Sequence, residues 1–270
     1  METEKGRAVL AVSFGTSHAD TCEKTIGAIE EEIRRVYPQY PVYRAWTSGM
    51  IRRKLEKRDG IHIFSVSEAM EQMKRDGISE VLVQPTHVLN GIENTRMEQE
   101  IETAGQLFDR IVVSSPLLTT GEDMERVVQA LIEEWRLDED EMLVYMGHGT
   151  DHHSNAVYGA LNDLLADRGC RNMIIGTVEA SPSVGDIVDA VKKTDMRRIV
   201  LAPFMIVAGD HANNDLAGDE EDSWKSIFEK EGYEVRCELK GLGEYESIRR
   251  IFLRHLNEAL QEMEKGQKQS

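Results

Sequence analysis

The segment Leu143-Val-Tyr-Met-Gly-His-Gly-Thr-Asp-His152 repeats an earlier one, Val9-Leu-Ala-Val-Ser-Phe-Gly-Thr-Ser-His18. Each is a short apolar run that ends in a turn containing glycine. A second pair repeats as well: Val81-Leu-Val-Gln-Pro85 and Val200-Leu-Ala-Pro203, each followed six residues later by a glycine. Because internal repeats mark duplicated structural units, the sequence predicts two homologous lobes.

Short, β-branched apolar runs alternate with helical patterns along the chain. Strands that are buried on both faces of a parallel sheet have this near-continuous apolar character. Apolar residues recur at helical spacing from Ile26 to Val36 and again from Ile248 to Met263. The alternation predicts an α/β fold with two similar doubly wound parallel-sheet lobes and a cleft between them. The predicted strands are 8–12, 81–85, 111–113, 143–146, 173–175 and 199–203.

The repeat also predicts where one lobe ends and the next begins. We expect an N-terminal lobe over residues 1–138 and a C-terminal lobe over residues 139–270, joined at the acidic stretch Asp138-Glu-Asp140. The last helical pattern, about residues 244–264, belongs to neither repeat cleanly. Its amphipathic spacing fits two uses, which are packing on the first lobe and pairing with a second copy in a homo-oligomer.

The composition excludes several classes of protein. The chain has 270 residues, with 49 acidic and 32 basic side chains and a formal net charge of −17. Such a charge repels a phosphate backbone, so we expect no nucleic-acid partner. No apolar run approaches the roughly 20 residues of a membrane helix, and the N-terminus has no secretory pattern. The sequence therefore predicts a cytoplasmic protein without a membrane partner.

Several cofactor and catalytic motifs are missing from the sequence. There is no Gly-x-Gly-x-x-Gly after a strand, no Walker loop and no Gly-x-Ser-x-Gly elbow. The three cysteines are too widely spaced for a zinc clip or a redox pair. We therefore expect no nucleotide cofactor and no esterase activity.

Comparison of the two repeats shows where the second half has changed. Phe14, in the turn after the first repeated strand, corresponds to His148, which lies between two glycines. Trp46 corresponds, less closely, to Glu179. In both pairs an aromatic side chain is replaced by one that can bind a metal. Doubly wound sheets bind their ligands at strand ends, so these residues are candidates for a site.

Glu93 and His211 form a third pair, since each lies eight residues after the repeated proline. Both halves keep a polar side chain at this position. The second half thus collects two imidazoles and a carboxylate, from His148, Glu179 and His211. This donor set, with coordination positions left over, suits a divalent first-row metal that must also meet a substrate. The acidic neighbour Asp210 is a candidate to orient His211. Taken alone, each of these residues also fits an ordinary polar loop.

Taken together, the motifs of this sequence resemble those of the anaerobic sirohydrochlorin cobaltochelatase family, the early-insertion class II tetrapyrrole chelatases. The resemblance covers nearly the whole chain. Several motifs in the right order are far more specific than any one of them. They are Val12-Ser-Phe-Gly-Thr-Ser17, Arg44-Ala-Trp-Thr-Ser-Gly-Met-Ile51, Gln84-Pro-Thr-His-Val-Leu-Asn-Gly-Ile-Glu93, Met146-Gly-His-Gly-Thr150, Gly176-Thr-Val-Glu-Ala180 and Pro203-Phe-Met-Ile-Val-Ala-Gly-Asp-His-Ala-Asn-Asn-Asp215.

The resemblance implies insertion of Co2+ into sirohydrochlorin, with loss of two protons, in anaerobic cobalamin biosynthesis. By motif position it implies that His148, Glu179 and His211 hold the metal and that His148 is the general base. We expect Glu93 to take the second proton. Insertion of Fe2+ or Ni2+ stays open, because a site of two histidines and one glutamate is intrinsically unselective among first-row metals. We expect His87 to be structural.

Four residues of the first half are candidate contacts to the substrate. Phe14 and Trp46 could offer apolar surface to the macrocycle, or they could be core aromatics. Sirohydrochlorin is a polycarboxylate and the chain is acidic, so a local basic patch is required. Arg52 and Arg53 belong to a basic cluster that could supply it, although they also fit a solvated helix face.

Two other classes of function compete with the chelatase. A tetrapyrrole or metal carrier could keep the fold and lack turnover. A periplasmic-type binding protein would share two α/β lobes around a cleft, but the sequence has no export pattern and such binding would not need both His148 and His211.

Overall fold

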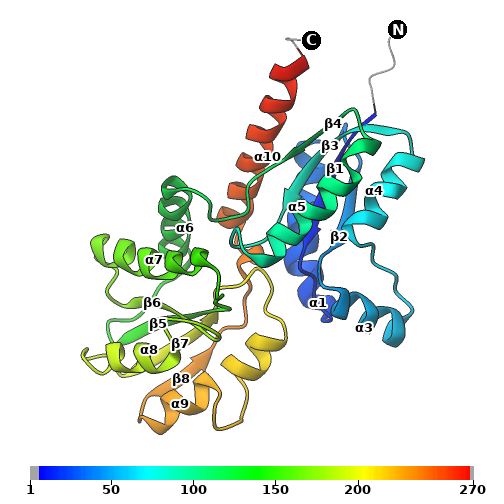
Figure 1. The fold of residues 1–270 in the computed structure, drawn as a ribbon. Helices are drawn as coiled ribbons and strands as arrows, with labels where there is room; N and C mark the ends of the chain where they lie inside the picture. The colour runs from blue at the N-terminus through cyan, green and yellow to red at the C-terminus, as the bar shows by residue number, and fades with distance from the viewer. Residues whose placement is uncertain (1–5, 268–270) are drawn as a thin grey trace. The chain divides into compact units, whose positions relative to one another are not determined.

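The computed structural model describes residues 6–267, which form two α/β units (Figure 1). The first unit holds the described residues up to Thr119 and those from Glu246 onward, and the second is Thr120–Tyr245. Each unit contains one four-stranded parallel sheet. The strands are β1 (Gly6–Ser13), β2 (Val42–Trp46), β3 (Ile78–Pro85), β4 (Arg110–Val113), β5 (Glu141–Gly147), β6 (Met173–Thr177), β7 (Arg198–Pro203) and β8 (Glu234–Cys237).

The two sheets have the same strand order, β2-β1-β3-β4 in the first unit and β6-β5-β7-β8 in the second. The prediction of two doubly wound parallel lobes is confirmed. Strands β2 and β8 were not among the predicted strands. Both lie at the edge of their sheet, where a strand does not need a continuous apolar run: β2 carries Arg44, and β8 alternates partly buried and exposed residues.

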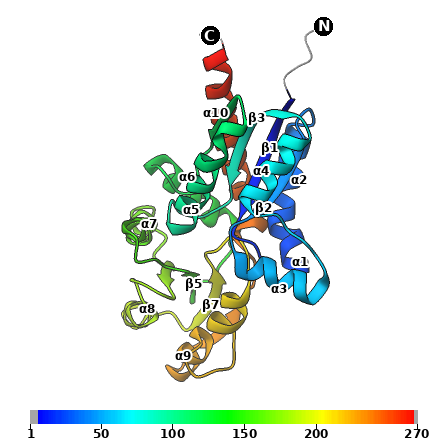
Figure 2. The ribbon, with the colours of Figure 1, turned by 45° about the vertical axis from the view of Figure 1, so that its right-hand side comes forward.

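Helices cover both faces of each sheet. In the first unit, Ala8, Leu10 and Val12 of β1 pack with apolar residues of α4 and α5, and α2 and α10 pack on the opposite face. Figures 1 and 2 show α6 and α7 on one side of the second sheet and α8 and α9 on the other. The helices are α1 (Ala19–Cys22), α2 (Ala28–Val36), α3 (Gly49–Asp59), α4 (Val66–Arg75), α5 (Ile92–Ala104), α6 (Gly121–Glu134), α7 (Ala156–Asp167), α8 (Val184–Val191), α9 (Trp224–Lys230) and α10 (Glu246–Gln267).

The helix that follows the last strand of each sheet belongs to the other unit. After β4 the chain passes into α6, which packs against α7 of the second unit, and after β8 it passes into α10 of the first unit. The contacts therefore divide the chain between Thr119 and Thr120, rather than at the junction expected at residue 138. Sequence repeats locate the strands of a duplicated fold, but they do not show which sheet a connecting helix covers.

Helix α10 packs on the first sheet through its apolar stripe. Its buried residues contact β3, β4 and α2. The guanidinium of Arg110, on β4, donates hydrogen bonds to the carbonyls of Glu262 and Met263. Neither α10 nor any other helix within residues 6–267 is long and apolar enough to cross a membrane.

We predict that Leu256→Ala lowers the free energy of unfolding by about 2–5 kcal/mol, because the Leu256 side chain is fully buried where α10 meets the first sheet. Asn257→Ala is the matched control, since Asn257 is the next residue of α10 and is exposed. Urea unfolding followed by circular dichroism measures both. Equal effects of the two substitutions would show that α10 does not stabilise the first unit.

Candidate metal centre

Three candidate ligands follow three neighbouring strands of the second sheet. His148 comes directly after β5 and Glu179 two residues after β6. His211 follows β7, at the start of the helical segment that continues as the π-helical turn Ala212–Leu216. The order β6-β5-β7 places these strands side by side. Because the carboxyl ends of parallel strands meet at one edge of the sheet, the three side chains reach the same place.

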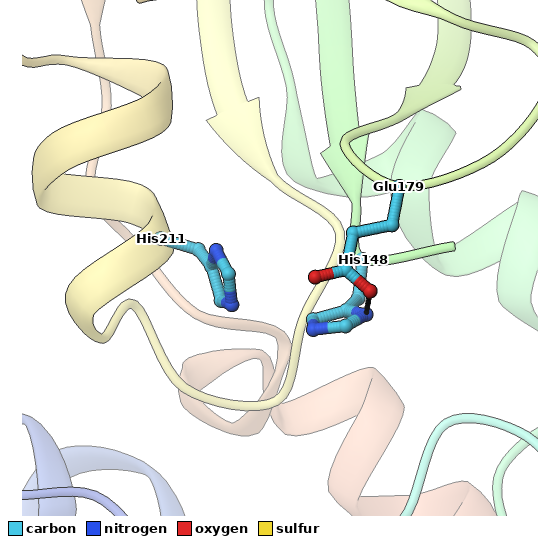
Figure 3. A group of neighbouring side chains, drawn as sticks. All are labelled: His148, Glu179 and His211. Atoms are coloured by element: carbon cyan, nitrogen blue, oxygen red, sulfur yellow. Dashed lines mark ion pairs between the residues drawn. The ribbon is translucent and has the colours of Figure 1, made fainter. Parts of the chain in front are cut away.

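The three side chains form a compact group (Figure 3). One ligand atom from each of His148, Glu179 and His211 lies within 4.8 Å of the others. The Glu179 carboxylate is 3.6 Å from Nδ1 of His148, and the two imidazole rings are nearly perpendicular, with centroids 4.7 Å apart. The side chains are between 39% and 56% exposed, so all three are accessible to solvent.

The turn that carries His148 depends on its two glycines. Gly149 has φ of +82°, and a Cβ there would lie 2.9 Å from Cβ of Ala180. A Cβ on Gly147 would lie 2.5 Å from the Tyr158 ring. The backbone N–H of Glu179 donates to the carbonyl of His148 at 2.9 Å. The turn thus holds the backbones of two candidate ligands together.

Hydrogen bonds leave one nitrogen of each histidine available. Nδ1 of His148 lies 2.9 Å from the Gly149 carbonyl, and Nδ1 of His211 lies 2.7 Å from the Asp215 carboxylate. Both contacts favour a proton on Nδ1 and a lone pair on Nε2, the usual arrangement of a histidine ready to bind a metal. The carboxylate hydrogen-bonded to His211 is that of Asp215, and the role expected for Asp210 stays a prediction. His211 and Asp215 are four residues apart, about one helical turn, and this spacing is the signal in the sequence that could have predicted their contact.

The group fits a divalent metal after a small adjustment. Two ligands that each lie about 2.1 Å from one ion can be no more than about 4.2 Å apart. Separations of up to 4.8 Å therefore require a small rotation of exposed side chains. Two imidazoles and one carboxylate occupy three positions and leave others open, as a site that exchanges its metal needs.

In the first unit, the turn after β1 has the same backbone hydrogen bond as the turn after β5, but it carries different side chains. The N–H of Ser48 donates to the carbonyl of Phe14 at 3.2 Å, as Glu179 donates to His148. Ser48 is therefore the counterpart of Glu179, and the proposed match with Trp46 is wrong by two residues. Trp46 pairs with Ser13 in the sheet, as Thr177 pairs with Gly147.

The two aromatic candidates have different environments. Phe14 is 45% exposed, so its ring is available to a ligand. Trp46 is only 2% exposed, and its ring packs so closely on the turn that a Cβ at Gly15 would lie 2.6 Å from Cε3. Trp46 is thus a core side chain in this structure, and it supports the turn that carries Phe14 rather than presenting apolar surface to a macrocycle.

Glu93 lies in the first turn of α5, at the position that His211 occupies in the second unit. Arg96 donates a hydrogen bond to its Oε1 at 2.7 Å. Its Oε2 is buried and accepts no hydrogen bond from residues 6–267. The carboxylate thus has one oxygen toward solvent and one toward the interior of its unit.

The two candidate arginines lie at the start of α3. Arg52 forms an ion pair with Glu68 at 3.2 Å, whereas the exposed Arg53 forms no hydrogen bond or ion pair within the described part of the chain. Both guanidinium groups reach toward Gly49, with Arg53 the closer. Arg53 is therefore the more available of the two for an anionic ligand.

We predict that Gly149→Ala lowers the free energy of unfolding by about 1–3 kcal/mol, because the alanine must adopt positive φ and crowd Ala180. The matched control is Gly159→Ala in α7, where a Cβ meets no atom within 4 Å. There the same substitution should leave stability unchanged or raise it by about 0.5–1 kcal/mol. Chemical unfolding measures both, and equal effects would mean that the turn at Gly149 is not constrained.

Comparisons with known proteins agree with the motifs and the geometry. The sirohydrochlorin cobaltochelatase of Salmonella typhimurium is 39% identical over 255 residues, covering 94% of this chain and 96% of the relative. The sirohydrochlorin cobaltochelatase CbiKC of Nitratidesulfovibrio vulgaris is 33% identical over 266 residues, covering 96% and 91%. Residues 7–261 match the family model of the cobalt chelatase CbiK.

Solved structures share the fold at low sequence identity. SirB from Bacillus subtilis with Fe3+ has a TM-score of 0.65 at 14% identity, covering 94% of this chain and 95% of that one. CbiX, the terminal enzyme of sirohaem biosynthesis in denitrifying bacteria, has a TM-score of 0.55 at 16% identity, covering 94% and 99%. The match over nearly the whole length, together with the motifs, confirms the resemblance: this chain belongs to the cobalt chelatase (CbiK) family.

Proposed function

We propose that this chain is a sirohydrochlorin cobaltochelatase, which inserts Co2+ into sirohydrochlorin and releases two protons in cobalamin biosynthesis. The observation that carries the proposal is the group of His148, Glu179 and His211 within 4.8 Å, in a chain that is 39% identical to a sirohydrochlorin cobaltochelatase over 94% of its length. A cytoplasmic location and assembly into a homo-oligomer stay predictions.

Co2+ would bind first to the second unit. Nε2 of His148, Nε2 of His211 and the Glu179 carboxylate would replace part of the water shell of the ion. Asp215 accepts a hydrogen bond from Nδ1 of His211, so this imidazole keeps its orientation as a ligand. Nδ1 of His148 is hydrogen-bonded to a carbonyl oxygen, with the Glu179 carboxylate farther away at 3.6 Å, so His148 would be the weaker ligand and the one suited to release the metal.

Insertion requires two pyrrole N–H bonds to break. In each, the proton leaves and the electron pair stays on nitrogen, where it forms the new bond to cobalt. As His148 releases the metal, the lone pair on its Nε2 becomes free to accept the first proton. Glu93 would accept the second on a carboxylate oxygen. Two N–H bonds are thus exchanged for one N–H bond on imidazole and one O–H bond on the carboxylic acid.

The substrate contacts are inferred from exposure and charge. Sirohydrochlorin is a polycarboxylate, and the chain has a net charge of −17, so a local cation must offset the repulsion. Arg53 is exposed without an ion pair, and Arg52 shares its charge with Glu68. The exposed ring of Phe14 would supply apolar contact to the macrocycle.

The first test is anaerobic absorbance spectroscopy of sirohydrochlorin with Co2+. We expect native protein to accelerate conversion over the protein-free rate, and His148→Ala to lower the rate by about 10²–10⁴-fold, because it removes a ligand and the base together. His62→Ala is the control, since His62 is an exposed histidine of the first unit. A spectral change on binding without acceleration would favour a carrier over an enzyme.

The second test concerns the arginines. Arg53→Ala should raise KM for sirohydrochlorin about two- to fivefold with little change in kcat, the range expected for one exposed charge, and the increase should shrink at high salt. Arg52→Ala should have a smaller effect because Arg52 is already paired with Glu68. Arg75→Ala, which removes a paired cation of α4, controls for net charge. If the double variant Arg52→Ala, Arg53→Ala keeps the native KM, these residues do not contact the substrate carboxylates.

A further inference from the structure

Helix α3 of the first unit has no counterpart in the second. In the second unit the chain passes from β6 into α8, whose N-cap Ser183 begins a capping box. Ser65 begins the same kind of capping box at the start of α4. The backbone N–H at the end of β2 donates to the carbonyl of the residue before Ser65, as the N–H at the end of β6 does before Ser183. Helix α4 is therefore the equivalent of α8, and α3 is an addition that the duplicated fold does not require.

Polar contacts hold α3 against the turn that carries Phe14. The N–H of Ser48, the N-cap of α3, donates to the carbonyl of Phe14 at 3.2 Å. Near the other end of the helix, the guanidinium of Arg58 donates to the carbonyl of Ser17 at 2.8 Å. Leu55 is the single buried residue of α3, and Figures 1 and 2 show the helix near the carboxyl ends of the strands, instead of over a face of the sheet. Helix α3 therefore adds little to the core and leaves most of its side chains accessible.

One face of α3 is apolar at its start and cationic farther along. Met50, Arg53 and Lys57 lie at positions i, i+3 and i+7, so their side chains share this face. Met50 is 70% exposed, although it is a large apolar side chain. Arg53 and Lys57 are exposed, and neither side chain forms an ion pair or a hydrogen bond with any residue that the structure describes. At a rise of about 1.5 Å per residue, the face extends about 10 Å from Met50 to Lys57.

The positive charge of this face is not neutralised from within α3. The basic residues of the helix outnumber its acidic residues by five to two, whereas the whole chain has a net charge of −17. Both acidic residues have other neighbours, because the Glu56 carboxylate lies 3.4 Å from Nδ1 of His62 and Asp59 pairs with Arg58. Exposed cations that lie close together raise the local potential and attract an anion. An anionic ligand that also has apolar surface would match both parts of the face.

We propose that the exposed face of α3, formed by Met50, Arg53 and Lys57, binds the rim of the tetrapyrrole, so that Met50 and Lys57 are substrate-binding residues together with Arg53. This inference rests on the proposed function. Sirohydrochlorin has an apolar ring inside a rim of carboxylates, and the face presents the matching order of polarity as it leads away from Phe14. Met50 would contact the edge of the macrocycle next to Phe14. The two cations, one helical turn apart, would bind carboxylates of neighbouring side chains.

The test is equilibrium binding of metal-free sirohydrochlorin to the whole chain, followed anaerobically by the change in sirohydrochlorin fluorescence. Lys57→Glu should raise Kd about three- to tenfold at low salt, because it exchanges an attraction for a repulsion, and the increase should shrink at high salt. Lys74→Glu is the matched control. Lys74 is an exposed lysine in the last turn of α4, and this substitution makes the same change in net charge. It should change Kd by less than about twofold.

Met50→Asn tests the apolar part of the face. It should raise Kd about two- to fivefold at low and at high salt alike, because salt does not screen the burial of apolar surface. Val36→Asn is the control, since Val36 is an exposed apolar residue at the end of α2 in the same unit. This control should leave Kd unchanged.

Two results would overturn the inference. They are equal effects of Lys57→Glu and Lys74→Glu, and a Met50→Asn variant that binds as tightly as the native chain. If Lys57→Glu changes the sedimentation of the chain and not its Kd, the face binds a second copy instead of the substrate.

The binding assay contains no Co2+, so its result is separate from the test of the proposed function. A native chain that binds sirohydrochlorin through α3 without accelerating insertion is a carrier, and the inference about α3 stands. A chain that accelerates insertion while its Kd is insensitive to α3 keeps the proposed function and overturns the inference. A native chain that does not bind sirohydrochlorin would overturn both.

Discussion

Parallel pairing of β5 with β6 and β7 is the constraint on which the rest of the site depends. The register aligns Gly147 with Thr177 and Met146 with Pro203, so the three strands end at nearly one level. Residues that lie far apart in sequence then emerge into the same space, without any need for a long connecting loop. The hydrogen bond from Glu179 to the His148 carbonyl continues the sheet geometry one step beyond the strands.

Duplication explains why the two units share one backbone frame and differ in the side chains that it carries. Both units use the same strand order, the same hydrogen bond after the central strand, and a glycine with positive φ in the same turn. In the second unit this frame carries His148 and Glu179, and in the first it carries Phe14 and Ser48. Side-chain replacement on a retained frame thus gives the second unit the candidate metal ligands, whereas the first unit carries Phe14 and Ser48 at the equivalent positions.

Charge is unevenly distributed along the chain. The chain is strongly acidic, yet α3 carries a run of basic residues next to the turn of Phe14. Glu68 neutralises part of this run, and Arg53 stays exposed. A local cation on an acidic protein can attract an anionic ligand in spite of the net charge.

The sequence by itself determined the duplicated parallel fold and the three candidate ligands, because apolar runs report burial and repeats report equivalent strand ends. Local patterns do not state which surface covers a segment, so only the tertiary structure decided that Trp46 is buried in the core and that α6 and α10 cover the sheets of opposite units. Contacts across a helical turn or between loops also need coordinates. The structure alone therefore placed Asp215 behind His211.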